Sequence, residues 1–106
     1  MIYVVTWQER PMGSPEAYEA AQKRILGVFQ HWHFPETIKI REFLVYAGHW
    51  GGVMVIETDD LAPIHKLTTA LPGLSFQISQ AMEVADAVSL EAEAIAWRDS
   101  LEGKTQ

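Results

Sequence analysis

The sequence predicts one α+β domain over residues 1–106, with the order strand, helix, strand, strand, helix, strand and an extra C-terminal helix. Four short segments are β-branched, aromatic or alternately apolar, as is typical of strands. Three longer segments repeat apolar residues at steps of three and four, as amphipathic helices do. Glycine, proline and aspartate separate these segments. This order is that of the split βαβ, or ferredoxin-like, arrangement.

The first strand is expected over residues 2–8, a β-branched and aromatic run. A helix start follows at residues 14–16, where serine can cap free amides, proline suits the first position and glutamate favours the positive end of the helix dipole. The helix is expected to stop at Pro35. Its apolar face repeats at helical spacing and consists of Tyr18, Ala21, Ile25, Val28, Phe29 and Trp32.

The second strand is expected over residues 36–46, where the pattern alternates. The glycine-rich turn at residues 48–52 then predicts a hairpin, followed by a strand at residues 53–58. Strict alternation would place Ile38, Ile40, Leu44 and Tyr46 on one face, and Lys39, Arg41, Phe43 and Val45 on the other.

Asp59 or Asp60 is expected to cap the second helix, with a buried stripe of Leu61, Ile64, Thr68 and Leu71. The fourth strand is expected to run from Leu74 towards Val84. Asp86 should then cap a last helix that reaches about Leu101 and ends at Gly103. Its apolar face is expected to consist of Ala87, Leu90, Ala94, Trp97 and Leu101.

Two strands carry apolar residues on both faces, at positions 2–5 and 53–56. A ferredoxin-like fold covers one sheet face with its two main helices and leaves the other face open. A homodimer that packs sheet against sheet would bury the second face. The C-terminal helix is the competing cover.

Composition limits the partners. The formal charge of −6 and the pI near 5.0 argue against nucleic acid and anionic membranes. The absence of cysteine excludes disulfides, thiolate metal sites and cysteine nucleophiles. No apolar run approaches the roughly 20 residues that span a bilayer, and the N-terminus lacks the pattern of a signal peptide. We therefore expect a cytoplasmic protein.

The opening Tyr3-Val-Val-Thr-Trp7 and the block Gly51–Asp60 resemble a family of small bacterial proteins, domain-of-unknown-function family 3303. The strand that begins at Leu74 also lies where that family has its last strand. The resemblance covers most of residues 1–84 and implies a ferredoxin-like fold of the dimeric α/β-barrel type. The chain departs from the family in its second helix, which lacks the expected tryptophans, and at residues 79–82, which replace a proline-containing strand end.

The resemblance implies no agreed activity. Related barrels include cofactor-independent monooxygenases, isomerases, haem proteins and ligand binders, so the fold alone does not choose among them. The sequence assigns no cofactor. Our first hypothesis is a dimeric domain that binds a hydrophobic small molecule or a partner protein. The alternatives are an enzyme of the monooxygenase or isomerase type acting on an aromatic substrate, and a haem-binding protein.

Several strand residues with large apolar side chains are candidates for lining a pocket under the helices or inside a dimer barrel. Ordinary core packing explains them equally simply. These residues are Tyr3, Trp7, Tyr46, Met54 and Phe76.

Two histidines are candidate catalytic residues. His49 precedes Trp50 in the hairpin turn, where an imidazole could act as base or donor at a pocket mouth and the indole could contact a ligand. His65 lies beside the buried stripe of the second helix, where it could act as a base or an axial haem ligand. The alternatives are exposed packing for His49 and Trp50, and a solvated helix surface for His65.

We assign no metal site. His31 and His33 are two positions apart near a helix end, and such residues do not share one helix face. Glu57, Asp59 and Asp60 form an acidic run, but its place before a helix makes the aspartates caps. Phosphate-binding, dinucleotide-binding and nucleophile-elbow motifs are absent from the sequence.

Overall fold

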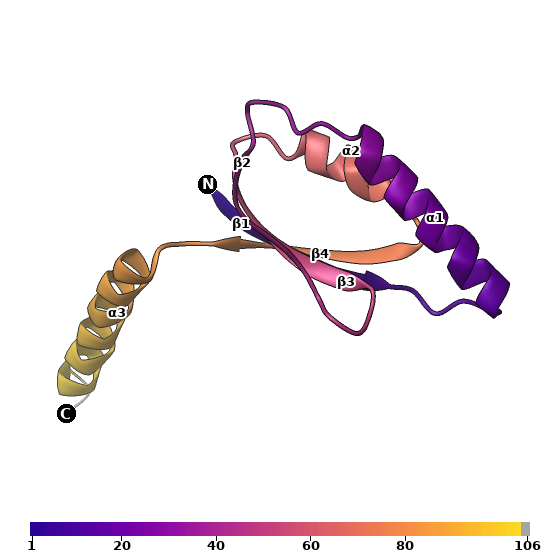
Figure 1. The fold of residues 1–106 in the computed structure, drawn as a ribbon. Helices are drawn as coiled ribbons and strands as arrows, with labels where there is room; N and C mark the ends of the chain where they lie inside the picture. The colour runs from indigo at the N-terminus through magenta and orange to yellow at the C-terminus, as the bar shows by residue number, and fades with distance from the viewer. Residues whose placement is uncertain (105–106) are drawn as a thin grey trace.

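The computed structural model describes residues 1–104, and these form one antiparallel sheet, two helices packed on it and a third helix that projects from it (Figure 1). The elements are β1 (Ile2–Glu9), α1 (Pro15–His31), β2 (Lys39–Val45), β3 (Gly51–Glu57), α2 (Ala62–Ala70), β4 (Leu74–Ala81) and α3 (Val84–Lys104). The sheet order is β2-β3-β1-β4, and all neighbours are antiparallel. This confirms the predicted ferredoxin-like βαββαβ fold with an extra C-terminal helix.

The core lies between the sheet and the two helices α1 and α2. Ile56 from β3 and Ile64 from α2 have no exposed surface, and Val5 in β1 is nearly as buried. The register pairs Val5 with Met54, so their side chains point to the same sheet face. The other core residues are Trp7, Ile25, Ile38, Leu67, Leu71 and Leu74.

The start of α1 confirms the predicted cap. The Ser14 hydroxyl accepts a hydrogen bond from the Ala17 amide at 3.1 Å, and Pro15 begins the helix. The helix ends at His31, four residues before the expected stop at Pro35. Trp32 is extended, and its ring packs edge-on against Phe34 at 6.2 Å between centroids. The helix therefore ends where Trp32 becomes extended, before the proline is reached.

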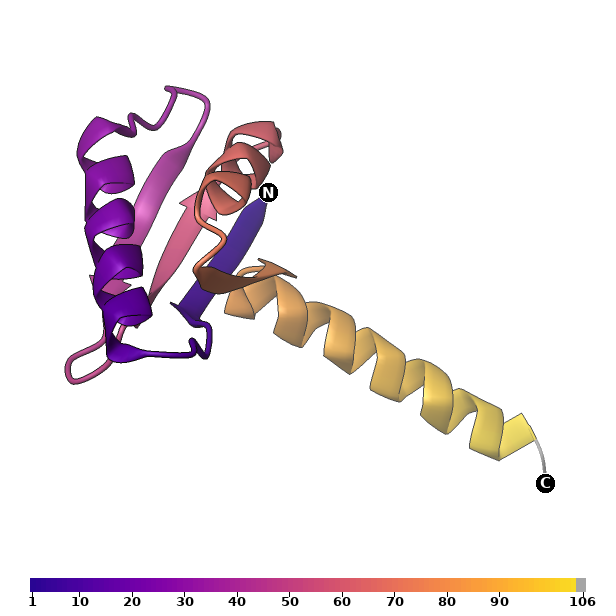
Figure 2. The same ribbon diagram turned by 90° about the vertical axis from the view of Figure 1, so that its right-hand side faces the viewer.

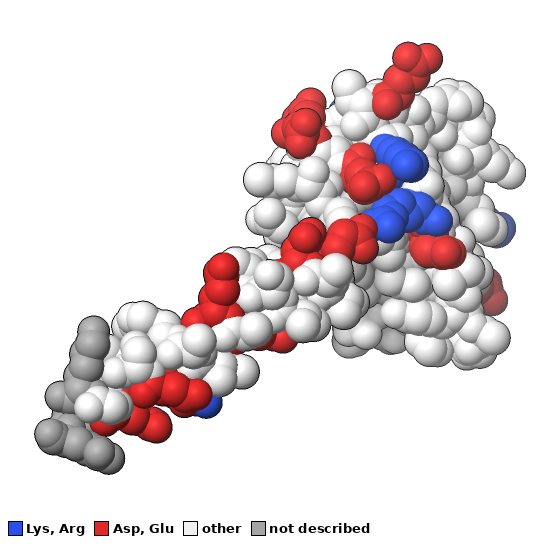
Figure 3. All heavy atoms as spheres, turned by 90° about the vertical axis from the view of Figure 1, so that its left-hand side faces the viewer, with Lys and Arg blue, Asp and Glu red and all other residues white. Residues whose placement is uncertain are grey.

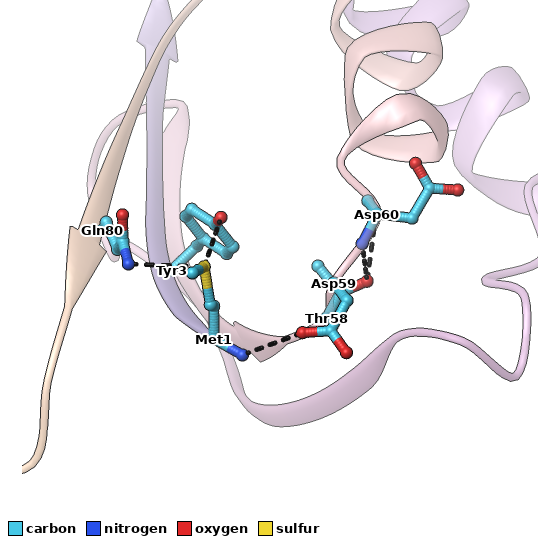
Figure 4. Close-up of polar contacts among 6 residues, drawn as sticks. All are labelled: Met1, Tyr3, Thr58, Asp59, Asp60 and Gln80. Atoms are coloured by element: carbon cyan, nitrogen blue, oxygen red, sulfur yellow. Dashed lines mark hydrogen bonds and ion pairs between the residues drawn. The ribbon is translucent and has the colours of Figure 1, made fainter.

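The start of α2 is held by a small polar network (Figure 4). The Asp60 carboxylate accepts a hydrogen bond from the Ala62 amide at 2.9 Å, which satisfies a free amide of the first turn. The Thr58 hydroxyl accepts from the Asp60 amide and donates to the Asp60 carbonyl, both at 3.0 Å. Asp59 instead lies 3.4 Å from the N-terminal ammonium of Met1. The N-cap position itself is Leu61, which makes no side-chain capping bond, so the prediction that an aspartate occupies it was wrong; Asp60 acts from one residue earlier.

A β-bulge in β2 changes the predicted faces of this strand. Ile40 pairs with Ile56, yet Glu42 pairs with the next residue of β3, so Arg41 is an extra residue. The prediction that Ile40 and Leu44 share a face was therefore wrong. After the bulge, Phe43 and Val45 turn to the helix side, together with Ile40, and Leu44 turns to the open face.

One of the two predictions for the open sheet face was that α3 covers it. In the structure α3 does not cover this face. Every residue from Val84 to Gly103 is exposed except Ala87, which is half-buried. Figures 1 and 2 show α3 pointing away from the sheet and the other helices, and the molecule measures 67 Å along its longest axis.

The ends of α3 also differ from the prediction. The helix starts at Val84 because the Ala87 amide bonds to the Glu83 carbonyl at 3.0 Å, so Asp86 lies inside the first turn. It continues through Gly103 to Lys104. At its root, Arg41 pairs with Glu83 at 2.9 Å, and this hydrogen bond and charge raise the pKa of Arg41 above its ordinary value.

Candidate ligand pocket

An open pocket of about 630 Å³ lies between α1 and the hairpin of β2 and β3. Its volume falls in the range of small-molecule sites, which is about 300–1,000 Å³. Its walls are mainly aromatic and aliphatic. The lining residues are Trp7, Ile25, Leu26, Phe29, Phe43, Val45, Tyr46, Gly48, His49, Trp50, Gly51 and Leu74.

Trp7 and two phenylalanines form a connected aromatic wall. The ring of Phe43 meets Trp7 edge-on at 5.6 Å and Phe29 edge-on at 6.2 Å between centroids. Edge-on contacts at these separations are favourable because of the charge distribution of aromatic rings. Phe43 can take this place only because the bulge at Arg41 turns it to the helix side.

Glycines leave room for this wall. Gly51 and Gly52 were expected in the turn, but both are buried residues of β3. A Cβ on Gly52 would lie 2.5 Å from Cζ2 of Trp7. Of the hairpin glycines, Gly48 has the positive φ, 90°, that a turn uses. The consecutive glycines of β3 therefore accommodate rings.

The hairpin loop forms the mouth of the pocket. The imidazole of His49 stacks on the ring of Tyr46 with 5.0 Å between centroids and 31° between planes. Two backbone hydrogen bonds fix the loop: the Tyr46 amide donates to the Gly51 carbonyl at 2.9 Å, and the Glu9 amide donates to the Trp50 carbonyl at 3.1 Å. His49 is exposed and Trp50 is half-buried. An imidazole and a phenol hydroxyl are thus presented beside apolar walls.

Met54 and Phe76 do not line this pocket. They border a cavity of about 10 Å³ together with Trp7 and residues of α2. That space is no larger than a single water needs, and Met54 is almost completely buried. Met54 therefore belongs to the packed interior, whereas Phe76 is half-buried and also lines a second open pocket of about 230 Å³ with Trp7 and Tyr46.

Tyr3 and His65 lie away from the pocket. The Tyr3 hydroxyl is at the opposite end of β1 from Trp7 and donates to the sulfur of Met1 at 3.5 Å (Figure 4). His65 is exposed on α2, and its carbonyl accepts hydrogen bonds from the hydroxyls of Thr68 and Thr69 at 2.8 and 2.9 Å. Of the candidate site residues, the structure brings together Trp7, Tyr46, His49 and Trp50.

The structure adds wall residues that were not among the sequence candidates. Ile25, Leu26 and Phe29 come from α1, and Phe43 and Val45 come from β2. The apolar stripe of α1 indicated the first group in part. The second group was hidden because alternation alone cannot locate a bulge.

The described residues, 1–104, contain no cluster of three histidine, aspartate or glutamate side chains placed to hold a metal ion. His31 is the last residue of α1, and His33 follows beyond the extended Trp32. Two buried side-chain polar atoms of this part of the chain lack a hydrogen-bond partner, Oε2 of Glu9 and Nε1 of Trp32. No helix within residues 1–104 is long and apolar enough to cross a membrane.

Several solved structures match this chain, two of which are described below, and no curated protein matches the sequence. A muconolactone isomerase is 16% identical with a TM-score of 0.54, over 78% of this chain and 90% of that chain. A protein named as an antibiotic biosynthesis monooxygenase from Deinococcus radiodurans is 13% identical with a TM-score of 0.45, over 79% of this chain and 95% of that one. At such identities, the likeness to the isomerase shows a common fold and not a common reaction.

The sequence also matches a family model, described as Domain of unknown function (DUF3303), over residues 1–95. The match includes the whole sheet, α1, α2 and the first half of α3. Because it spans most of the 106 residues, the chain belongs to the DUF3303 family.

Proposed function

We propose that this domain binds an apolar aromatic small molecule in the pocket between α1 and the β2–β3 hairpin. The observation that carries the proposal is the pocket of about 630 Å³ with walls formed mainly by rings and aliphatic side chains. Sites of this size with apolar walls and few polar groups are typical of small-molecule binding. The small cavity near Met54 is too confined for this role.

The arrangement of the walls suggests the shape of the ligand. Trp7, Phe29 and Phe43 offer ring faces and edges at the base, where a planar apolar body can pack. The polar groups lie at the mouth, where His49 stacks on Tyr46. A ligand with a flat apolar body and one polar substituent therefore suits the pocket best.

Titration calorimetry with 2-naphthol as the probe tests this proposal. Leu26 lines the pocket and is 54% exposed, so Leu26→Arg should leave the fold intact and place a charge against the apolar probe. Leu90→Arg on α3 is the matched control, because Leu90 is 53% exposed and lies outside the pocket. We expect Leu26→Arg to weaken binding about tenfold or more and the control to bind like the unaltered protein. Equal affinities in the two variants, or no binding by the unaltered protein, would contradict the proposal.

A second candidate function is an enzyme that transfers a proton to or from a bound aromatic substrate. The specific observation is His49, whose ring is held against Tyr46 at the pocket mouth and remains exposed. A positioned imidazole can accept or donate a proton, and such catalysis typically contributes about 10²–10⁴-fold. Tyr46 would position the imidazole.

Aromatic lactones and hydroxyaromatics are suitable substrates for testing this candidate, with absorbance and oxygen consumption as readouts. His49→Ala should lower turnover at least about 100-fold. His65→Ala is the control, since His65 is exposed on α2 and does not line the pocket. Turnover that is the same in both variants would remove His49 from the reaction.

We also propose that the open sheet face forms a homodimer interface. The apolar residues of this face come from three neighbouring strands, and the register places them on one side: Ile2, Val4, Leu44, Val53 and Val55. Because α3 leaves this face uncovered, a second copy is the simplest cover. Such a dimer leaves the pocket accessible, because the pocket lies on the helix side.

A further inference from the structure

Helix α3 carries large apolar side chains that are exposed to solvent in the single chain. Trp97 is 65% exposed, and Leu90 and Leu101 are also exposed. A helix of this kind gains most of its stability from packing an apolar face rather than from intrinsic propensity. An exposed tryptophan with neighbouring leucines on a 21-residue helix therefore indicates a contact surface.

Besides the exposed Val84, Val88 and Ile95, α3 carries five apolar residues that follow the spacing of a helix-pairing seam. The steps between them are three, four, three and four, the a and d positions of two heptads. The first four alternate between small and large side chains. The stripe consists of Ala87, Leu90, Ala94, Trp97 and Leu101. This spacing fits another helix better than it fits a flat sheet surface.

We propose that α3 packs antiparallel against α3 of a second copy of the chain. In the register that sets Leu90 opposite Leu101 of the second copy, Ala94 lies opposite Trp97 of the second copy. Each large ring then fits over a small side chain, as interdigitating helix layers require. The two-fold symmetry of the pair repeats this contact.

The charges beside the stripe favour the antiparallel orientation. In the same register, Glu91 lies beside Arg98 of the second copy, and symmetry gives this ion pair twice. On the other flank, Glu93 meets the uncharged Ser100. A parallel pair would bring Glu93 beside Arg98 but also Asp86 beside Glu91, so two like-charge contacts would offset its two ion pairs. Within its own helix, Arg98 lies 3.9 Å from Asp99 in an exposed and therefore weak pair, so it can exchange partners.

The shape of the molecule leaves room for this contact. Figures 1 and 2 show α3 projecting from the body, and Figure 3 shows acidic side chains along it. A 21-residue helix is about 31 Å long, so an antiparallel pair places the two bodies at opposite ends. The surface is separate from both the pocket and the open sheet face. The inference therefore goes beyond the proposed function and does not depend on it.

Cross-linking between two single-cysteine variants tests the orientation directly, because the natural chain has no cysteine. Glu93→Cys and Ser100→Cys are mixed, one of them isotopically labelled, and treated with a short bismaleimide. Mass spectrometry then separates the mixed product from the two same-variant products. An antiparallel pair predicts that the mixed product predominates, because Glu93 faces Ser100 of the second copy. Ser89→Cys mixed with Ala96→Cys is the control: the two positions have the same spacing but lie on the outer side of α3.

The result overturns the proposal if same-variant products predominate, as parallel helices would give, or if the yield equals that of the control mixture. Adding Trp97→Glu to both variants should reduce the mixed product at least about tenfold, because it puts a charge into the seam. Circular dichroism and the urea midpoint of unfolding check that the body remains folded in these variants.

A charge exchange provides a second, independent readout. Glu91→Arg should lower the rate of mixed cross-linking about threefold or more, and Glu91→Arg with Arg98→Glu should restore it. The two residues are seven positions apart, about 10.5 Å along the helix, so restoration reports on the second copy. Failure of the double exchange to restore the rate would contradict the antiparallel pair.

Discussion

Two glycines at the start of β3 show how single residues shape the pocket. Gly51 and Gly52 are buried, and the rings of Tyr46 and Trp7 lie where their side chains would be. Gly27, by contrast, lies within α1, and a Cβ there would meet nothing within 4 Å. The same residue type is therefore required at one position and dispensable at another.

We predict opposite effects on stability for alanine at these positions. Gly52→Ala would place Cβ against the Trp7 ring and the Leu44 carbonyl oxygen, and overpacking of this kind costs about 1–3 kcal/mol. Gly27→Ala should stabilise the protein by about 0.5–1 kcal/mol, because glycine is unfavourable inside a helix. Urea denaturation monitored by circular dichroism measures both. The prediction fails if Gly52→Ala is as stable as the unaltered protein.

At the scale of elements, α2 shows how adjacent positions of one helix differ. Ile64 has no exposed surface and packs in the core, whereas His65, the next residue, faces solvent. Leu67 completes the buried side of this short helix. The orientation of α2 therefore decides that His65 does not reach the pocket.

Alanine substitutions at these two positions should separate core from surface. Ile64→Ala should lower the free energy of unfolding by about 2–5 kcal/mol, because it leaves a cavity under the sheet. His65→Ala should change it by less than about 0.5 kcal/mol. Chemical denaturation of the two variants provides the comparison, and a large loss in His65→Ala would show that the histidine has a structural contact.

The strand β2 shows where an element departs from its sequence pattern. One extra residue, Arg41, reverses the direction of Phe43 and Leu44 relative to Ile40. This places Phe43 in the aromatic wall of the pocket and Leu44 on the open face. The bulge in this edge strand thus decides which residues of β2 lie on each face of the sheet.

At the scale of the whole molecule, two apolar surfaces remain without a partner in the single chain. One is the open face of the sheet, and the other is the stripe of α3. The open sheet face and the α3 stripe would form two different interfaces between copies. A substitution in one interface should therefore leave the other interface intact. Each interface can therefore be tested without the other.

We predict that Val55→Lys makes the sheet-face dimer dissociate. The new ammonium group would lie opposite Glu42 in β2, which allows the single chain to tolerate it. In a sheet-on-sheet dimer the same charge would be buried at considerable cost. Light scattering coupled to size-exclusion chromatography at micromolar concentration measures the mass. Gln30→Lys, on the exposed side of α1, is the control and should not change it.

The sheet-face model also makes a prediction for the unaltered protein, which should not have the mass of one chain in this measurement. A monomeric mass would remove the model. The cross-linking experiment on α3 does not depend on this result, because it tests a different surface.

The sequence by itself determined the element order, the cap of α1 at Ser14 and the excess of apolar residues on both sheet faces. It also included Trp7, Tyr46, His49 and Trp50 in a larger set of candidate site residues, without showing which of them lie together. These features depend on local spacing and on residue chemistry, which a sequence displays directly. Only the tertiary structure decided that Tyr3 and His65 lie elsewhere, that Phe43 joins the wall and that α3 projects from the sheet. The physical reason is that a bulge, the rotation of a helix and the direction of a terminal helix follow from contacts between distant residues, which no local pattern records.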